Sequence, residues 1–181
     1  MIGRMVTLGA AVLALAACHK PAVDERNASV ADVAKAVRQA QASDMKFTPG
    51  RWESSFKIES MEAPGMPAAA AKAVAGHVTR YATCLTKDKA AQPGSDFFAR
   101  DSKNCTYDHF TMGGGAIDAK MHCGNAGGDA VVTMKGDYTP THYALKMETV
   151  TNAARQGPIT MRMAIEANHA GVCTGKEDGQ G

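Results

Sequence analysis

The chain has 181 residues, of which 45% are hydrophobic and 21% are charged, and its formal net charge is +2 at pH 7. This length suits one domain with a substantial core and is short for two. The chain has 20 basic and 18 acidic residues and so lacks the excess of positive charge that is typical of nucleic-acid-binding proteins. No nucleic-acid partner is therefore expected.

The first residues, MIGRMVTLGAAVLALAAC, have the pattern of an export signal. One basic residue, Arg4, precedes an uncharged apolar run and then small residues before Cys18, which is the order typical of a signal peptide. The apolar run is shorter than the ~20 residues that a membrane-spanning helix needs. We therefore expect residues 1–17 to be a signal peptide that is removed.

The last residues of this signal, Leu15-Ala16-Ala17-Cys18, resemble the lipobox of bacterial lipoproteins. The resemblance implies lipid attachment at Cys18, and two or more acyl chains anchor a protein stably to a membrane. His19 follows where the inner-membrane retention signal usually has Asp, which implies sorting to the outer membrane. We expect a chain anchored on the periplasmic side of a bacterial membrane; the alternative is an ordinary cleavage site that leaves Cys18 as a free thiol.

Residues 18–46 are expected to form a lipid-anchored tether followed by an amphipathic helix. The tether, residues 19–26, is short and polar. Ser29 followed by Asp32 resembles a capping box at the start of a helix over about residues 29–43. Its apolar residues recur at helical spacing: Val30, Val33, Ala34 and Val37. This narrow stripe favours a helix that lies on the domain over one that binds a partner.

From Phe47 onward the hydrophobic period changes to two, which indicates β-strands. Strands are predicted at residues 51–60, about 77–85, 105–112, 116–123, 129–138, 142–150 and 160–167, with short helical segments at 68–75 and 86–92. The fold class is therefore mainly β: a curved antiparallel meander sheet of about seven strands, covered by the N-terminal helix and one or two short helices. This single β domain is assigned to residues 47–175, and residues 176–181 are assigned to a polar tail.

Four cysteines remain once Cys18 is assigned to lipid, and an even number in an oxidising compartment indicates disulfides. Three glycines at residues 113–115, flanked by strand-like residues, predict a hairpin. If that hairpin is centred on Gly114, Cys105 lies opposite Cys123, within disulfide range. We predict the disulfide Cys105–Cys123 and, from the remaining pair, Cys84–Cys173. With no C-x-x-C pair and no nearby histidine pair, no metal site is expected.

One face of the predicted sheet is rich in methionine, whose flexible, polarizable thioethers suit a surface that holds a hydrophobic ligand. The candidate ligand face consists of Met121, Val132, Met134, Leu145, Met147, Met163 and Ile165. The alternative is a closed core that uses methionine as filler.

No catalytic constellation is found, so we expect a non-catalytic protein without a cofactor. There is no G-x-S-x-G motif for a hydrolase, and Ser95 with Asp96 lacks a placed histidine. Copper is a weaker alternative, because thioethers and imidazoles suit Cu(I). The unbroken hairpin register puts His109 and His122 on opposite faces, and Met161 with Met163 is the only tight spacing of possible ligands.

Several landmark motifs occur in a fixed order: Pro49-Gly50-Arg51-Trp52-Glu53, Pro64-Gly65-Met66-Pro67, Cys84-Leu85-Thr86 and Gly171-Val172-Cys173. This series resembles a proteobacterial family of periplasmic proteins, often lipoproteins, defined as domain of unknown function 3617. The likeness covers about residues 47–173 and supports the all-β prediction and the two disulfides. It assigns no functional role to any position, and Trp52 is interpreted as a core anchor.

These observations favour a lipid-anchored envelope protein that binds an apolar molecule or another envelope component. A purely structural or protein-interaction lipoprotein with a packed core is the main alternative. A hydrolase and a copper-binding protein are weaker ones.

Overall fold

The structure, a computed structural model, describes residues 22–41, 46–91, 104–125, 128–153 and 157–180, so the predicted signal peptide and Cys18 lie outside it. Its helices are α1 (Val30–Gln41), α2 (Ala68–Val74) and α3 (Lys87–Ala91). Its strands are β1 (Val23–Ser29), β2 (Gly50–Glu62), β3 (Val78–Leu85), β4 (Cys105–Gly113), β5 (Ala116–Asn125), β6 (Gly128–Thr139), β7 (His142–Ala153), β8 (Gly157–His169) and β9 (Gly179–Gln180).

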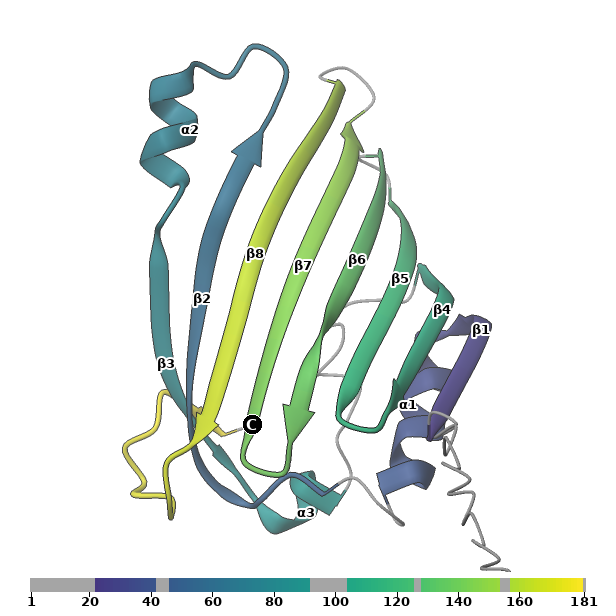
Figure 1. The fold of residues 1–181 in the computed structure, drawn as a ribbon, viewed down its shortest axis with the longest axis vertical. Coiled ribbons are helices and arrows are strands. Elements are labelled where there is room, and N and C mark those ends of the chain that lie inside the picture. Colours follow the sequence, from purple (N-terminus) through teal and green to yellow (C-terminus); the bar gives the residue numbers. More distant parts are fainter. Residues whose placement is uncertain (1–21, 42–45, 92–103, 126–127, 154–156, 181) are drawn as a thin grey trace, which may run out of the picture.

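All the strands belong to one curved, open sheet in the order β1-β4-β5-β6-β7-β8-β2-β3-β9 (Figure 1). β4 to β8 form the predicted antiparallel meander, and β2 then joins its far side by pairing with β8. Eight strands pair antiparallel, and β9 adds a short parallel pairing to β3. The mainly β fold and both predicted disulfides, Cys84–Cys173 and Cys105–Cys123, are confirmed.

The eighth antiparallel strand is β1, which lies where the sequence predicted a tether through Arg26. β1 pairs with β4 at the edge of the sheet, with Val23 opposite Met112. Only Val23 and Ala28 are buried in this charged segment, and Asn27 interrupts the alternation with a φ of 49°. The two buried apolar residues are separated by an odd number of positions, so the segment lacks the alternation that identifies a strand from sequence. The prediction of a tether was therefore wrong from Val23 onward.

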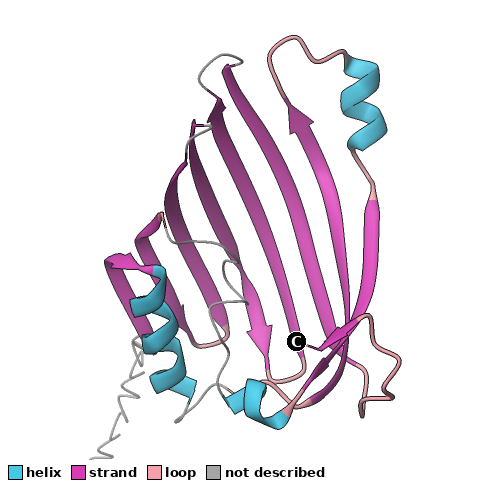
Figure 2. Ribbon diagram, turned by 180° about the vertical axis from the view of Figure 1, so that it is seen from behind, coloured by secondary structure: helices cyan, strands magenta, loops and turns pink. Residues whose placement is uncertain are grey.

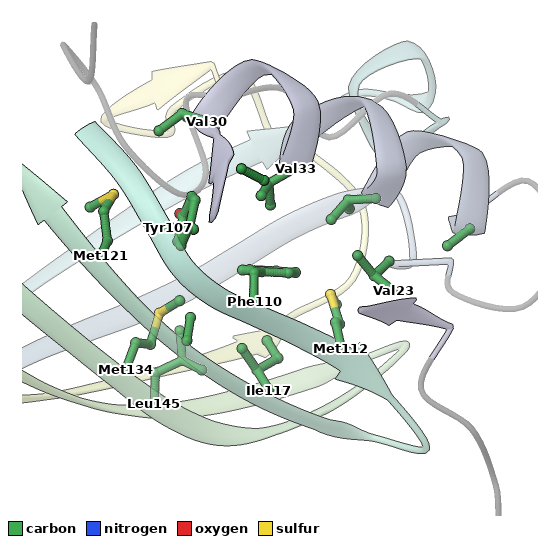
Figure 3. Close-up of a cluster of buried hydrophobic side chains, with 14 residues drawn as sticks. Val23, Val30, Val33, Tyr107, Phe110, Met112, Ile117, Met121, Met134 and Leu145 are labelled. Atoms are coloured by element: carbon green, nitrogen blue, oxygen red, sulfur yellow. The ribbon is translucent and has the colours of Figure 1, made fainter. Parts of the chain in front are cut away.

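The main core lies between α1 and the β1–β4–β5 end of the sheet (Figure 3). From α1, Val33 and Val37 are almost fully buried, and from β4, Tyr107 and Phe110 are as well. Burial raises the pKa of Tyr107 to about 12. The structure confirms the predicted helix, including its cap: the backbone N–H of Asp32 donates to Oγ of Ser29 over 3.1 Å.

Replacing Ser29 with alanine should cost about 1 kcal/mol of unfolding free energy, because the first turn of α1 loses this acceptor. Urea unfolding measures the difference. Ser55→Ala on β2 is the control, since it removes a hydroxyl that caps no helix. Equal stability of S29A and wild type would show that the cap contributes nothing.

The β4–β5 hairpin has the predicted disulfide but a different turn. Gly114 and Gly115 form a two-residue turn with φ values of 58° and 81°, a left-handed backbone that glycine adopts without strain. The predicted register holds from Cys105, opposite Cys123, to Tyr107; beyond a bulge at Asp108 it shifts by one residue. The bulge turns His109 to the same face as His122, so the prediction that the two histidines lie on opposite faces was wrong.

The two shorter helices lie at the ends of the sheet rather than across it (Figure 2). α2 has no buried residue, so it gives no cover to the apolar face. α3 begins after Thr86, whose Oγ1 accepts from the N–H of Lys89 at 3.3 Å. Among the residues that the structure describes, no helix has the length and apolar character needed to cross a membrane.

The C-terminal residues, predicted as a polar tail, are instead held against β3. Asp178 makes two hydrogen bonds with Ala82. The N–H of Asp178 donates to the carbonyl oxygen of Ala82 at 2.9 Å, and the carboxylate of Asp178 accepts from the N–H of Ala82 at 2.8 Å. The side chain of Glu177 is 3% exposed; it accepts from the N–H and hydroxyl of Thr174 and pairs with Arg51 at 3.4 Å. The sequence suggested a free tail because these residues are polar. In the structure, the same charged residues make the contacts that hold the segment in place.

The carboxyl of Glu177 should make stability depend on acid pH. Bonds from Thr174, with the Arg51 guanidinium beside them, lower its pKa from 4.5 to about 2. Because the folded pKa is below the unfolded one, this stabilisation is complete above pH 4.5 and is lost as the pH falls toward 2. Urea unfolding from pH 6 to 2 should show a smaller acid loss for Glu177→Gln than for wild type. Glu166→Gln on the exposed sheet face should follow wild type; identical curves for all three would contradict the prediction.

Candidate apolar binding face

The inner face is defined here as the sheet face on which α1 lies. Strand alternation turns every second side chain toward it, and from β5 across to β2 these positions carry no Asp, Glu, Lys or Arg. The charged residues of the same strands, such as Lys146, Glu148 and Arg162, face the other side. The inner face is thus apolar over most of its width.

The seven residues of the predicted ligand face all lie on this inner face, but they differ in burial. Met121, Met134 and Leu145 are buried in the core near α1. Val132, Met147 and Ile165 are partly buried and pack against that core. Met163 is partly buried and belongs to neither buried cluster. The sequence therefore predicted which of these side chains share one face of the sheet, whereas the structure shows that the α1 end of this face is closed.

Strand β2 extends the face with residues that the sequence analysis did not assign to it. Phe56 lies opposite Ile165, Ile58 opposite Met163, and Met61 opposite Met161. A bulge between Ile58 and Ser60 brings Met61 back to the inner side, so simple alternation from Trp52 could not have placed it there. The pairing of β2 with β8, which are far apart in the sequence, is what joins the two sets.

We call the partly exposed side chains of this region the open half: Ile58, Met61, Met147, Met161 and Met163. α1 contacts β1 and β4 and lies across the other end of the sheet (Figure 2). Within the described ranges no helix covers the open half.

An aromatic cluster closes the inner face near the start of β2. Phe47, Trp52, Tyr138 and Tyr143 lie with neighbouring ring centroids 5.7 to 6.1 Å apart. Trp52 is 4% exposed, and its indole N–H donates to the carbonyl oxygen of Thr48 at 2.9 Å. Burial raises the pKa of Tyr143 to about 12. Trp52 is therefore a core anchor, as interpreted from the sequence, and its face is not available to stack on a ligand.

The neighbours of Trp52 fasten the C-terminal segment to β2. The N–H of Arg51 donates to the carbonyl oxygen of Gly171 at 2.8 Å, and its guanidinium pairs with Glu53 and Glu177. Gly50 has a φ of 139°, and a Cβ atom there would overlap that same Gly171 oxygen. The Pro-Gly-Arg-Trp-Glu motif is thus explained by structure.

Two aspartate–histidine pairs lie on the outer face of β4 and β5. Asp108 contacts His122 at 2.7 Å, and Asp118 contacts His109 at 2.9 Å. The histidines lower the pKa of both carboxyls, and Lys120 and Lys135 lower them further. No group of three His, Cys, Asp or Glu side chains suited to a metal ion occurs in the described part of the chain. The earlier candidates Ser95 and Asp96 lie outside it.

These features define a small β protein: an open antiparallel sheet linked by two disulfides, with one helix closing one end of its apolar face. Residues 47–173, more than two thirds of the chain, match the family described as Protein of unknown function (DUF3617), and the chain belongs to this family. Neither curated proteins nor solved structures gave a match. The matched region begins after α1, although β1 and α1 contribute to the same core.

Proposed function

We propose that this protein is a non-catalytic, lipid-anchored envelope protein that binds an apolar molecule on the open half of its inner face. The observation that carries the proposal is the row of partly exposed methionine and isoleucine side chains with no helix over it among the described residues. These five side chains are half-buried, and a contiguous apolar patch on a folded domain is the kind of surface on which proteins bind ligands and partners. Methionine side chains adapt to ligands of varied shape.

The proposed location is the periplasmic side of the outer membrane. Its support comes from the export signal, from Leu15-Ala16-Ala17-Cys18 and from His19. Two disulfides agree with this location, because such bonds persist in oxidising compartments. Radiolabelled palmitate should label the wild-type chain in bacteria and leave Cys18→Ser unlabelled. Equal labelling of the two would refute attachment at Cys18.

Ligand binding can be tested by comparing two substitutions in β2, one on each face of the sheet. Ile58→Glu places a carboxylate in the open half, whereas Lys57→Glu changes the charge of the adjacent residue on the outer face. Native mass spectrometry of protein extracted from its own membrane should show a bound apolar molecule in wild type and K57E, and its loss in I58E. Circular dichroism confirms that both variants fold.

A second readout uses dansyl-labelled undecanoic acid, whose fluorescence rises in an apolar site. Wild type and K57E should enhance it equally, and I58E should not. A ligand-free wild-type mass with no dansyl response would overturn the proposal. That result would instead favour a structural or protein-interaction role, for which the burial of Met121, Met134 and Leu145 is the supporting observation.

A further inference from the structure

We propose that Met147, Met161 and Met163, with Met61 beside them, form a thioether site for the soft monovalent cation Cu(I). The chain has 11 methionines, and these four come together through strand pairing rather than sequence spacing. The proposed site lies within the open half but requires a different chemistry from apolar binding.

The sheet register carries the proposal. Met147 on β7 lies directly opposite Met163 on β8, and Met61 on β2 lies directly opposite Met161 on β8. Met161 and Met163 are two residues apart on one strand, so both face inward. Directly opposed residues have Cβ atoms about 4.5–5.5 Å apart, and diagonal neighbours lie about 7–8 Å apart. Four thioethers therefore occupy two adjacent cross-strand pairs.

The side chains of Met147, Met161 and Met163 can bridge these separations. Met61 lies on the other side of β8 from Met147, about 10 Å away across two strand spacings, and reaches the site beside Met161. Three rotatable bonds separate the backbone of a methionine from its terminal methyl group, so sulfur atoms on neighbouring strands can turn toward one point. All four side chains are partly exposed, which leaves a route for an ion to enter. Met134, which lies opposite Met147, is buried at the edge of the core and bounds the site on the α1 side.

The chemistry of the surroundings selects the ion. Thioether sulfur prefers Cu(I), whereas Ca²⁺ and Mg²⁺ need carboxylate or carbonyl oxygen. The paired positions on the inner face from β5 to β2 include no charged oxygen ligand. A single positive charge next to apolar surface is costly unless ligands replace its water, and neutral sulfurs do this best for a soft ion.

The outer aspartate–histidine pairs are a poorer candidate for copper. Each imidazole is within 2.9 Å of a carboxylate, and Lys120 and Lys135 bring positive charge to the same carboxylates. A cation at either pair would be repelled by the lysine. The sulfur cluster has no such neighbour on its face.

The test uses the chain with Cys18→Ser, because a free thiol would compete for soft metals, and with methyl-¹³C-labelled methionine. Ag(I) serves as a redox-inert probe, and Cu(I) is then added under ascorbate. We expect one ion to bind per chain and the methyl resonances of Met61, Met147, Met161 and Met163 to shift. Those of Met66 and Met112 should stay in place.

The decisive variant is Met147→Leu/Met161→Leu/Met163→Leu, which keeps apolar volume and removes three sulfurs. It should lose Ag(I) and Cu(I) binding. Metal binding and the dansyl-fatty-acid response are also measured separately on the wild-type side chains, so a chain that binds the metals without enhancing dansyl fluorescence contradicts the proposed function and leaves this site standing. Met66→Leu/Met112→Leu, the control, should bind both metals as wild type does. Undiminished metal binding by the triple variant, or loss of binding in His109→Gln/His122→Gln instead, would overturn the proposal.

Discussion

Replacing the Cys84–Cys173 disulfide with two alanines is expected to lower the unfolding free energy by about 4–5 kcal/mol. The bond joins residues 89 positions apart, and a crosslink that closes a longer loop removes more conformational freedom from the unfolded chain. It also ties β3 to the segment that carries Glu177 and Asp178. A loss of this size is a large fraction of the ~5–15 kcal/mol stability of an ordinary domain.

The Cys105–Cys123 bond supplies a matched comparison, because its cysteines are 18 positions apart. Its removal should cost about 3 kcal/mol, less than the longer-range bond. Urea unfolding without reductant measures both double-alanine variants. The reverse order of stabilities would show that loop length does not govern the effect.

Gly50→Ala should destabilise the protein by about 2–6 kcal/mol, which combines about 1–3 for the backbone conformation with about 1–3 for overpacking. A methyl group at Gly50 would overlap the carbonyl oxygen of Gly171 and lie 2.6 Å from Nε2 of His169. Movement of the Gly171 carbonyl away from the methyl group would break the hydrogen bond that it accepts from the N–H of Arg51. Loosening of this corner should also expose Trp52, whose fluorescence would shift to longer wavelength.

Gly114→Ala separates the two contributions to that loss. Gly114 has a φ of 58°, yet nothing lies within 4 Å of a Cβ atom built there. This variant should therefore cost only the ~1–2 kcal/mol of a left-handed backbone. Thermal unfolding of both variants measures the difference, and equal losses would show that the contact with Gly171 is unimportant.

Local patterns predicted the parts of the fold that local physics decides. The period of two placed Tyr143, Leu145 and Met147 on one face, as the structure shows. The glycine-rich turn predicted the hairpin that joins Cys105 to Cys123. The exact pairing of the two cysteines also depends on the bulge at Asp108, which offsets the one-residue difference between the predicted turn and the observed turn. Ser29 and Asp32 correctly marked the start of α1, because a helix cap involves only its own first turn.

The missed features depend on long-range contacts or local irregularity. β1 is charged and is held as a strand by β4, which follows some eighty residues later in the chain. No periodicity reveals the bulge at Asp108. The hydrogen bonds of Asp178 require β3 to be in place, so a polar composition alone suggested a free tail.

The candidate site was predictable to the same extent. Alternation identified an apolar, methionine-rich face, yet the part that α1 closes and the part that stays open differ only through tertiary packing. The residues of β2 could not be assigned to this face from the sequence, because β2 joins it by pairing with a strand far along the chain, with Ile58 opposite Met163.

The order of strands in the sheet has a consequence for how the chain reaches its native state. β4 to β7 each pair with the strand that follows next in the chain, and such nearby contacts form quickly because little loop entropy opposes them. β2 must wait for β8, since Trp52 lies opposite His169. We therefore expect refolding in two stages: the meander and its short-range disulfide first, then β2 and β3. Until the second stage is complete, β8 is an unpaired edge that a chaperone, or another copy of the chain, could capture.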